Sequence, residues 1–433
     1  MTDREIGVAV LGLGNVGGEV VRLLADNAAD YQARVGAPVV LRGVAVRSVG
    51  ADRGVDEELL TTDAQALIDR DDVDVVVELI GGIEPARTLI TSALAQGKSV
   101  VTANKALLAD HGAALDAAVR AAGVDLYYEA AVAGAIPLIR PVRESLAGDR
   151  IDRVVGIVNG TTNFILSSMA ASGAEYSDAL AEASRLGYAE ADPTADVEGY
   201  DAAAKAAILA SLAFHTRVTA EDVYRQGISE ITAEDLDSAD AVDCTVKLLA
   251  ICERVTGEDG VDRVSARVYP ALLPKTHPLA TVDGAFNAVF IEAEAAGRLM
   301  FYGQGAGGTP TASAVLGDLI AAARNKMTGT AGTGESTYAQ LPIAPLRDTP
   351  TRYHVNMQVT DRPGVLAAVA EEFTRHGVSI SVVRQEDTAV GASLVVLTHT
   401  ARESDLQDTV AALGELEHVN VVTSVLRLEG TGE

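Results

Sequence analysis

Asp201 and Lys205 have the residue types and the spacing needed for acid–base chemistry. They are four residues apart in an alanine-rich stretch that is predicted to be helical, so they share one helix face. Residues 206–214 are apolar almost all round, which predicts a buried helix with Lys205 near the interior. A desolvated lysine beside carboxylates can supply a proton to a developing alkoxide. The alternative is a structural salt bridge between the two side chains on the surface.

Further candidate groups precede this helix and lie earlier in the chain. The stretch 187–205 holds five carboxylates, including Glu190. A second lysine, Lys105, closes the run Thr-Ala-Asn-Lys that follows the apolar segment 99–102. That order places Lys105 at the carboxyl edge of a sheet, where open α/β folds bind ligands. At that edge, Lys105 can contact a nicotinamide, a phosphate or a substrate carboxylate. The alternative is a solvated lysine at the start of a helix.

A glycine-rich turn near the N-terminus predicts a dinucleotide site. It reads Gly12-Leu13-Gly14-Asn15-Val16-Gly17, follows the apolar run 6–11 and opens the helical stretch 16–26. Such a turn brings bare backbone amides and a helix N-terminus to a pyrophosphate.

The end of the second predicted strand bears on the choice of cofactor. The strand at 39–46 ends without an acidic residue and is followed by Arg47. An arginine at this place accommodates the 2′-phosphate of NADP(H), which favours NADP(H), while use of NAD(H) stays open.

The pattern of elements around these residues predicts an α/β protein with three domains. Residues 1–135 alternate apolar strands with helices, as expected of a Rossmann-like, doubly wound domain with a parallel sheet. Residues 136–335 mix long helices with alternating segments, which predicts an α+β domain. Residues 336–350 contain three prolines and read as an exposed linker, and residues 351–433 follow a ferredoxin-like β-α-β-β-α-β order.

Composition excludes several classes of function. A formal net charge of −27 argues against nucleic acid and anionic membranes as partners. No apolar run is long enough to span a bilayer. The only cysteines, Cys244 and Cys252, are spaced like two buried thiols on one element, which fits a reducing cytoplasm. The chain has no HExxH motif or Cys/His cluster, so no transition-metal site is expected.

Three motifs, in the expected order, together resemble homoserine dehydrogenases along essentially the whole chain. They are Thr-Ala-Asn-Lys at 102–105, Gly-Ile-Val-Asn-Gly-Thr-Thr-Asn-Phe-Ile-Leu at 156–166, and the stretch 183–205. The resemblance implies reversible, NAD(P)-dependent interconversion of L-homoserine and L-aspartate 4-semialdehyde, in threonine, methionine and isoleucine biosynthesis. It also implies a homo-oligomer in which residues 136–335 form the substrate-binding and dimerisation domain.

The resemblance assigns roles to individual residues. Lys205 is similar to the family's proton donor to the aldehyde oxygen, and Lys105 to its second active-site lysine, near nicotinamide and substrate. Glu190 matches the carboxylate that receives the substrate's α-ammonium, and Asp201 the acid that orients the site. Gly305 lies in a second glycine-rich turn and is a candidate contact to nicotinamide, or simply part of a turn.

Residues 129–137 resemble the family's monovalent-cation loop. There, main-chain oxygens at Glu129, Val132, Gly134 and Ile136 would hold Na⁺ or K⁺. The sequence alone would describe this stretch as a buried connection between domains, kinked at Pro137.

Residues 361–366, Asp-Arg-Pro-Gly-Val-Leu, are similar to the loop of ACT domains, which sense amino acids and usually pair across subunits. In this family the module implies feedback inhibition by a pathway product, with threonine the expected effector. The same residues also fit a helix N-cap with proline near the first turn. Two other functions stay open: another NADP-dependent oxidoreductase of a small amino-acid aldehyde, and a catalytically silent amino-acid sensor.

Overall fold

The computed structural model describes residues 4–50, 53–257, 259–388 and 391–430. The chain forms two compact units, each built from stretches that are far apart in the sequence. The first unit comprises Met1–Val154, Ala204–Asp222 and Phe286–Gln340, and the second comprises Val155–Ala203, Val223–Ala285 and Leu341–Glu433. Two of the boundaries fall inside continuous elements, strand β7 (Ile151–Ile157) and helix α9 (Tyr200–Ala213).

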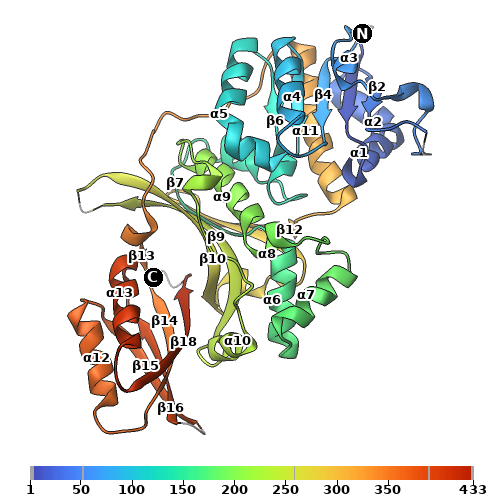
Figure 1. Cartoon of the computed structure of the whole chain (residues 1–433). Helices are drawn as coiled ribbons and strands as arrows, with labels where there is room; N and C mark the ends of the chain where they lie inside the picture. Colours follow the sequence, from blue (N-terminus) through green and yellow to red (C-terminus); the bar gives the residue numbers. More distant parts are fainter. Residues whose placement is uncertain (1–3, 51–52, 258, 389–390, 431–433) are drawn as a thin grey trace. The chain divides into compact units, whose positions relative to one another are not determined.

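The first unit contains a six-stranded sheet whose strand pairs are all parallel (Figure 1). Its order is β3-β2-β1-β4-β5-β6, so the chain reverses direction across the sheet between β1 and β4. This arrangement confirms the Rossmann-like prediction, and ligands of such sheets bind at the carboxyl ends of the strands near that reversal. The strands are β1 (Ile6–Leu11), β2 (Val39–Ala45), β3 (Leu60–Thr61), β4 (Val75–Glu78), β5 (Ser99–Thr102) and β6 (Leu126–Tyr127).

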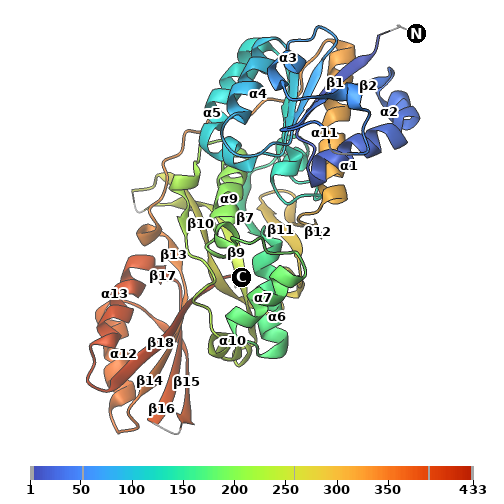
Figure 2. The same ribbon diagram turned by 45° about the vertical axis from the view of Figure 1, so that its right-hand side comes forward.

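Two groups of helices accompany this sheet, and one of them includes a helix from much later in the chain. Helix α11 packs against α1 and α2 and contacts β4 and β5, so it completes the Rossmann-like domain (Figure 2). Its apolar face, with Ala312, Val315 and Leu319, is fully buried in the same core as β1. The helices are α1 (Asn15–Asp26), α2 (Ala28–Val35), α3 (Ala64–Ile68), α4 (Ala86–Ala95), α5 (Lys105–Ala122) and α11 (Gly308–Thr328). The first unit also holds the antiparallel hairpin of β11 (Phe286–Ala293) and β12 (Gly297–Gln304).

The second unit is built on two long antiparallel strands, β9 (Cys244–Thr256) and β10 (Asp262–Pro274). A short strand, β8 (Tyr224–Arg225), pairs with β10 in parallel. The helices of this unit that precede β9 and lie wholly within it are α6 (Gly160–Ser172), α7 (Tyr176–Arg185), α8 (Thr194–Val197) and α10 (Ala233–Asp240).

The C-terminal part of the second unit has the ferredoxin-like order predicted from the sequence. Its sheet runs β18-β14-β16-β15, and an apolar core that includes Val355, Phe373 and Leu406 lies under the two helices. The elements are β14 (Tyr353–Val359), α12 (Val365–Arg375), β15 (Ile380–Thr388), β16 (Gly391–Thr398), α13 (Glu403–Gly414) and β18 (Val419–Leu428). Strand β18 also pairs in parallel with β10, where Arg427 is the register partner of Ala271.

Two details of this region qualify the sequence analysis. Helix α12 begins after Gly364, which takes a left-handed conformation and provides no side-chain cap, so the capping interpretation of residues 361–366 is wrong. The segment after Gln340 is tied to β10, because Val264 donates its N–H to Pro342 O and accepts the N–H of Ala344.

Both cysteines lie on β9 and both are buried free thiols, as the sequence predicts. Burial raises the pKa of the Cys244 thiol to about 11, which keeps it protonated at neutral pH. Among the described residues, no helix combines the length and the apolar character needed to cross a bilayer.

Candidate active site

The glycine turn between β1 and α1 depends on close backbone approaches. Gly12 has φ +106°, and a Cβ there would lie 2.7 Å from Leu79 O. A Cβ on Gly17 would lie 2.1 Å from Gly12 O. Helix α1 begins at Asn15, and no described side chain caps its N-terminus. Its first-turn N–H groups therefore remain suited to an anion such as a pyrophosphate.

A cavity of about 840 Å³ opens beside this turn at the carboxyl edge of the sheet. Its size is suited to a ligand as large as a nucleotide. Gly12, Gly14 and Arg47 are in its lining, as expected for a cofactor site. Arg53 also lines it and donates to Ser48 O at 3.3 Å, although sequence reasoning overlooked it. The available signal was a second arginine six residues after Arg47.

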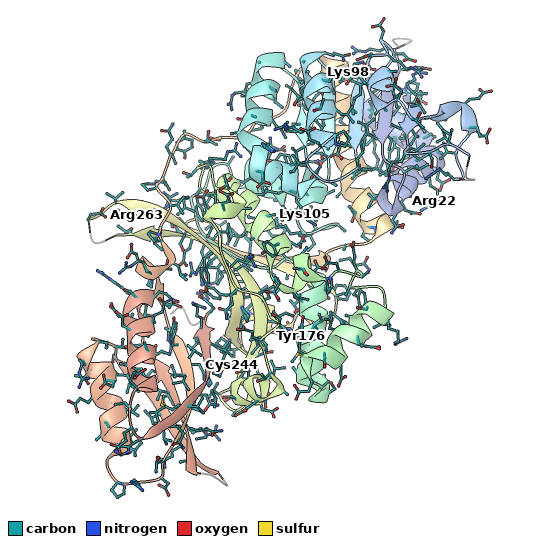
Figure 3. The ribbon with its side chains drawn as sticks, viewed as in Figure 1. Arg22, Lys98, Lys105, Tyr176, Cys244 and Arg263 are labelled. Carbon is teal, nitrogen blue, oxygen red and sulfur yellow. The ribbon has the colours of Figure 1, made fainter. Side chains whose placement is uncertain are left out.

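Lys105 is the first residue of α5, and Figure 3 labels it there. Its position is fixed by Asn104, whose side-chain oxygen accepts the N–H of Leu107 at 3.2 Å and so caps the helix. The same amide donates to Gly82 O at 2.6 Å, which ties the helix start to the loop after β4. Lys105 is half-buried.

The loop after β4 is organised by a buried carboxylate. Glu78 is fully buried at the end of this strand and accepts the N–H groups of Ile80 at 2.7 Å and Gly81 at 3.0 Å. It also accepts the hydroxyl of Thr102 at 2.6 Å, on the neighbouring strand. These bonds give the charge polar partners and join the ends of β4 and β5 beside Lys105.

Asp201 and Lys205 both lie on α9, one turn apart, and both are buried, with 7% and 8% of their surfaces exposed. The burial of Lys205 that the apolar helix predicts is therefore confirmed. Apolar neighbours on the helix, including Ala206, Ala207 and Leu209, are also buried. Because both side chains are buried, the alternative of a salt bridge on the surface is wrong.

Asp201 is held by an asparagine that sequence reasoning did not assign. The amide nitrogen of Asn159 donates to Asp201 Oδ2 at 2.9 Å and to Asp196 Oδ1 at 2.7 Å. The oxygen of the same amide accepts the N–H of Thr162 at 2.9 Å and caps α6. One buried side chain therefore starts a helix and bridges two carboxylates. Asn159 belongs to the motif at 156–166 that the sequence shows. Its role could not be inferred there, because the two carboxylates that it contacts lie 37 and 42 residues later in the chain.

Glu190 lies in the loop between α7 and α8 and is exposed. The preceding turn is fastened to α6, because the hydroxyl of Thr161 donates to Tyr188 O at 2.8 Å. The exposed carboxylate is available to a cationic group of a ligand.

Gly305 lies close to Gly134 of the predicted cation loop and to the buried Asn287. A Cβ on Gly134 would lie 2.3 Å from Gly305 O, and a Cβ on Gly305 would lie 2.1 Å from the amide of Asn287. Asn287 is 1% exposed, and its amide has no hydrogen-bond partner among the described residues. Ala135 donates its N–H to Gln304 O at 3.1 Å, so the predicted cation loop contacts the second glycine turn.

The segment 129–136 is organised around a buried carboxylate. Glu129 accepts the N–H groups of Leu138, Ile139 and Arg140 at 2.5 to 3.0 Å. Its own N–H donates to Asp318 at 2.7 Å. The pKa of Asp318 is raised to about 7, because the effect of burial exceeds the opposing effects of this hydrogen bond and of the charge of Arg140.

The cation expectation concerns the main-chain oxygens of this segment. Among the described residues, none of the hydrogen bonds assigned to Val132, Gly134 and Ile136 uses their carbonyl oxygens. All three residues are buried. Main-chain oxygens of buried residues that accept no assigned hydrogen bond would suit a monovalent cation. No group of three or more His, Cys, Asp or Glu side chains in the described part of the chain is arranged to hold a metal ion.

The predicted residues are thus distributed over both units. The first unit contains the glycine turn, Arg47, Lys105, Lys205, Gly305 and the segment 129–136, and the second contains Glu190 and Asp201. Helix α9 spans a boundary between the units in the sequence, with Asp201 before that boundary and Lys205 after it.

Comparison with known proteins identifies the family. Three family models match: the NAD-binding domain of homoserine dehydrogenase at residues 12–129, homoserine dehydrogenase at 137–320, and the ACT domain at 353–418. Homoserine dehydrogenase of Mycobacterium tuberculosis (strain H37Rv) is 64% identical over 99% of both chains, and that of Corynebacterium glutamicum is 60% identical over 98% of this chain and 96% of its own. The chain belongs to the homoserine dehydrogenase family.

Solved structures agree with this assignment. Homoserine dehydrogenase from Thiobacillus denitrificans is 40% identical over 99% of both chains, with a TM-score of 0.92. A hyperthermophilic archaeal homoserine dehydrogenase in complex with NADPH is 27% identical over 77% of this chain and all of its own, with a TM-score of 0.63. This member of the homoserine dehydrogenase family is thus an oxidoreductase with a nicotinamide-cofactor domain and a C-terminal ACT domain.

The glycine turn of this homoserine dehydrogenase family member gives a first prediction. In Gly17→Ala, the new Cβ would overlap Gly12 O, so the turn must shift and NADPH affinity should fall by tenfold or more, roughly 1.4 kcal/mol. The matched control is Gly18→Ala, because a Cβ there meets nothing within 4 Å. The control should bind NADPH normally and gain about 1 kcal/mol of stability from helix propensity. Equal NADPH dissociation constants for the two variants, measured by calorimetry, would contradict this description of the turn.

The role of Asn159 gives a second prediction. Asn159→Asp keeps an acceptor for the Thr162 N–H but replaces the donor to Asp196 and Asp201 with a third carboxylate. Repulsion should raise the carboxyl pKa values in the folded state, so the stability of the variant should fall as pH rises from about 4 to 7. Urea unfolding of variant and wild type should show a deficit of about 1–3 kcal/mol at pH 7 that shrinks near pH 4. A deficit independent of pH would argue against a bridge between carboxylates.

Proposed function

We propose that the chain catalyses the reversible reduction of L-aspartate 4-semialdehyde to L-homoserine with NADPH. The observation that carries this proposal is the burial of Lys205 one helical turn from Asp201. An ammonium group held in low-dielectric surroundings stabilises developing negative charge more strongly than it would in water.

The proposed mechanism follows from the charge that the reaction creates. When bound, the reduced nicotinamide supplies a hydride to the aldehyde carbon. The electron pair of the carbonyl moves to the oxygen, and Lys205 donates its proton there, which leaves the alcohol and a neutral amine. Asp201 orients the part of the site that contains Lys205. Lys105 provides a second positive charge near the nicotinamide and the substrate. Glu190 accepts hydrogen bonds from the α-ammonium of the substrate.

NADP(H) is the cofactor that we favour over NAD(H). Arg47 and Arg53 line the cavity beside the glycine turn, and guanidinium groups bind phosphate in a bidentate manner. The strand that precedes them, β2, ends at Ala45 and offers no acid for a ribose hydroxyl. The NADPH complex of the archaeal relative is consistent with this choice.

A monovalent cation is proposed for the segment 129–136, with Na⁺ or K⁺ bound by main-chain oxygens at Glu129, Val132, Gly134 and Ile136. The support is that Val132, Gly134 and Ile136 are buried residues and that none of their assigned hydrogen bonds uses the carbonyl oxygen. The cation would be structural, because this segment is hydrogen-bonded to the turn that holds Gly305.

We further propose a cytoplasmic homo-oligomer that is inhibited by threonine through its ACT domain. The support is the ferredoxin-like module, the match to the ACT model and the free, buried cysteines.

Mixing the purified protein with homoserine and NADP⁺ at alkaline pH tests the reaction itself. Production of reduced nicotinamide, followed by its absorbance, is the expected result. Failure with both NADP⁺ and NAD⁺ would favour a silent amino-acid sensor. Activity only with a different small amino-acid aldehyde or alcohol would favour another reductase of this chemistry.

Replacement of the proposed proton donor tests the mechanism. Lys205→Ala should lower kcat by about 10²- to 10⁴-fold, because the proton transfer counts in the transition state. NADPH affinity, measured by fluorescence titration, should stay within twofold of wild type. An equal loss of kcat and cofactor affinity would instead identify Lys205 as a cofactor ligand.

Replacement of Arg47 tests the cofactor choice. Arg47→Ala should weaken NADPH binding by about 1.5–3 kcal/mol, as expected for a charged hydrogen bond, and leave NADH binding nearly unchanged. Arg34→Ala is a suitable control, since Arg34 is exposed on α2 and paired with Asp30 instead. If Arg47→Ala weakened both cofactors equally, Arg47 would not select the phosphate.

Thermal unfolding tests the cation. At equal ionic strength, Na⁺ or K⁺ should raise Tm relative to choline, because a ligand at about 100 times its Kd adds about 2.7 kcal/mol to the stability of the folded state. The same Tm in all three salts would contradict a bound cation.

A further inference from the structure

The segment around β8 is packed on the turn that leads into α9, inside the second unit. β8 (Tyr224–Arg225) is held by β10, and the residues after it contact the end of α8. Ile228 donates its N–H to Val197 O at 2.8 Å, and the hydroxyl of Ser229 donates to Glu198 Oε1 at 2.7 Å. The segment therefore supports the last residues before α9 from one side.

Arg225 makes the most direct contacts with this turn. Its guanidinium donates to Glu198 O at 2.6 Å and lies over the ring of Tyr200, 3.4 Å from the ring centre. Between these two contacts, Gly199 has φ +78°, and a Cβ there would lie 3.3 Å from the Arg225 side chain. Tyr200 immediately precedes Asp201, so Arg225 fixes the backbone from which the buried carboxylate projects.

The other side of β8 contacts the ACT domain. Arg427 of β18 is 8% exposed and forms a bidentate ion pair with Glu403, which is fully buried at the start of α13. The remaining guanidinium nitrogen of Arg427 donates to Gln226 Oε1 at 3.1 Å. The same guanidinium lies over the ring of Tyr224, 5.5 Å from its centre.

We infer that Arg225 is a positioning residue of the active site and that Gln226 links it to Arg427 of the ACT domain. The inference rests on the proposed function, because it assigns a route of regulation to that same site. A change in the ACT domain that moves Arg427 would be transmitted through β8 to the turn before Asp201 and, one helical turn later, Lys205. Two sites joined by packed, hydrogen-bonded groups can couple in this way when an effector favours one arrangement.

Amide hydrogen exchange of the peptide 194–203, together with steady-state kinetics, tests the positioning role in the full-length protein. Arg225→Met keeps the length of the side chain but removes the planar cation. Exchange in this peptide should rise several-fold, and kcat should fall about 10- to 100-fold, the scale expected when a catalytic group is misplaced by about 1 Å. The dissociation constant of NADPH should not change. Unchanged exchange, or faster exchange with wild-type kcat, would overturn the positioning role.

Gln226 tests the link to the ACT domain. Gln226→Met removes the acceptor for Arg427 and should raise exchange in 194–203, whereas Gln226→Glu offers a stronger acceptor and should slow it. The matched control is Ser238→Ala, which removes a different contact to the ACT domain, with His354 at 3.3 Å, and should leave this peptide unchanged.

The link would be overturned if both Gln226 variants exchanged like wild type, or if Ser238→Ala changed the peptide as much as Gln226→Met does. The exchange measurement requires no turnover. A wild-type protein that fails to oxidise homoserine would refute the proposed function while leaving this test of the structural link intact.

Discussion

Two oppositely charged side chains, Asp201 and Lys205, are buried one turn apart on helix α9. Removing such groups from water is costly unless each is paired or hydrogen-bonded. Much of the second unit near Asp201 can be understood as satisfying that requirement. Asn159 donates to the carboxylate, and the contacts of Arg225 hold the turn from which it projects. Burial in turn gives an ammonium at this place a large effect on a developing alkoxide.

The cofactor side is organised on the same principle, with polar groups at strand ends held by buried partners. Glu78 and Asn104 fix the loops around Lys105, and close backbone approaches require Gly12 and Gly17 where they stand. Rigid supports of this kind hold binding and catalytic groups near a productive geometry. The rigid sheet supplies the frame, and loops at its carboxyl edge carry the groups with function.

The sequence predicted those parts of the fold whose periodicity is strong. Strands β1 and β5 coincide with the apolar segments 6–11 and 99–102, and the ferredoxin-like order of the C-terminal part is confirmed. Helices α2 and α3 were missed because they are short, and α2 buries only Val35 among its residues, so it lacks an apolar face. The return of α11 to the cofactor domain could not follow from local pattern, because its partner α1 lies nearly 300 residues earlier. Lys205 could be identified from its residue type and its place in an apolar helix. Asn159 and Arg225 could not, because the residues that they contact are brought close only by the folded chain.

A crystal structure of the complex with NADP⁺ and L-homoserine would test the central claim most directly. In that complex Lys205 Nζ should lie within hydrogen-bonding distance of the homoserine hydroxyl, with the nicotinamide ring facing the carbon that carries this hydroxyl. Lys205 separated from that oxygen by more than one water molecule, or paired only with the cofactor phosphates, would contradict it.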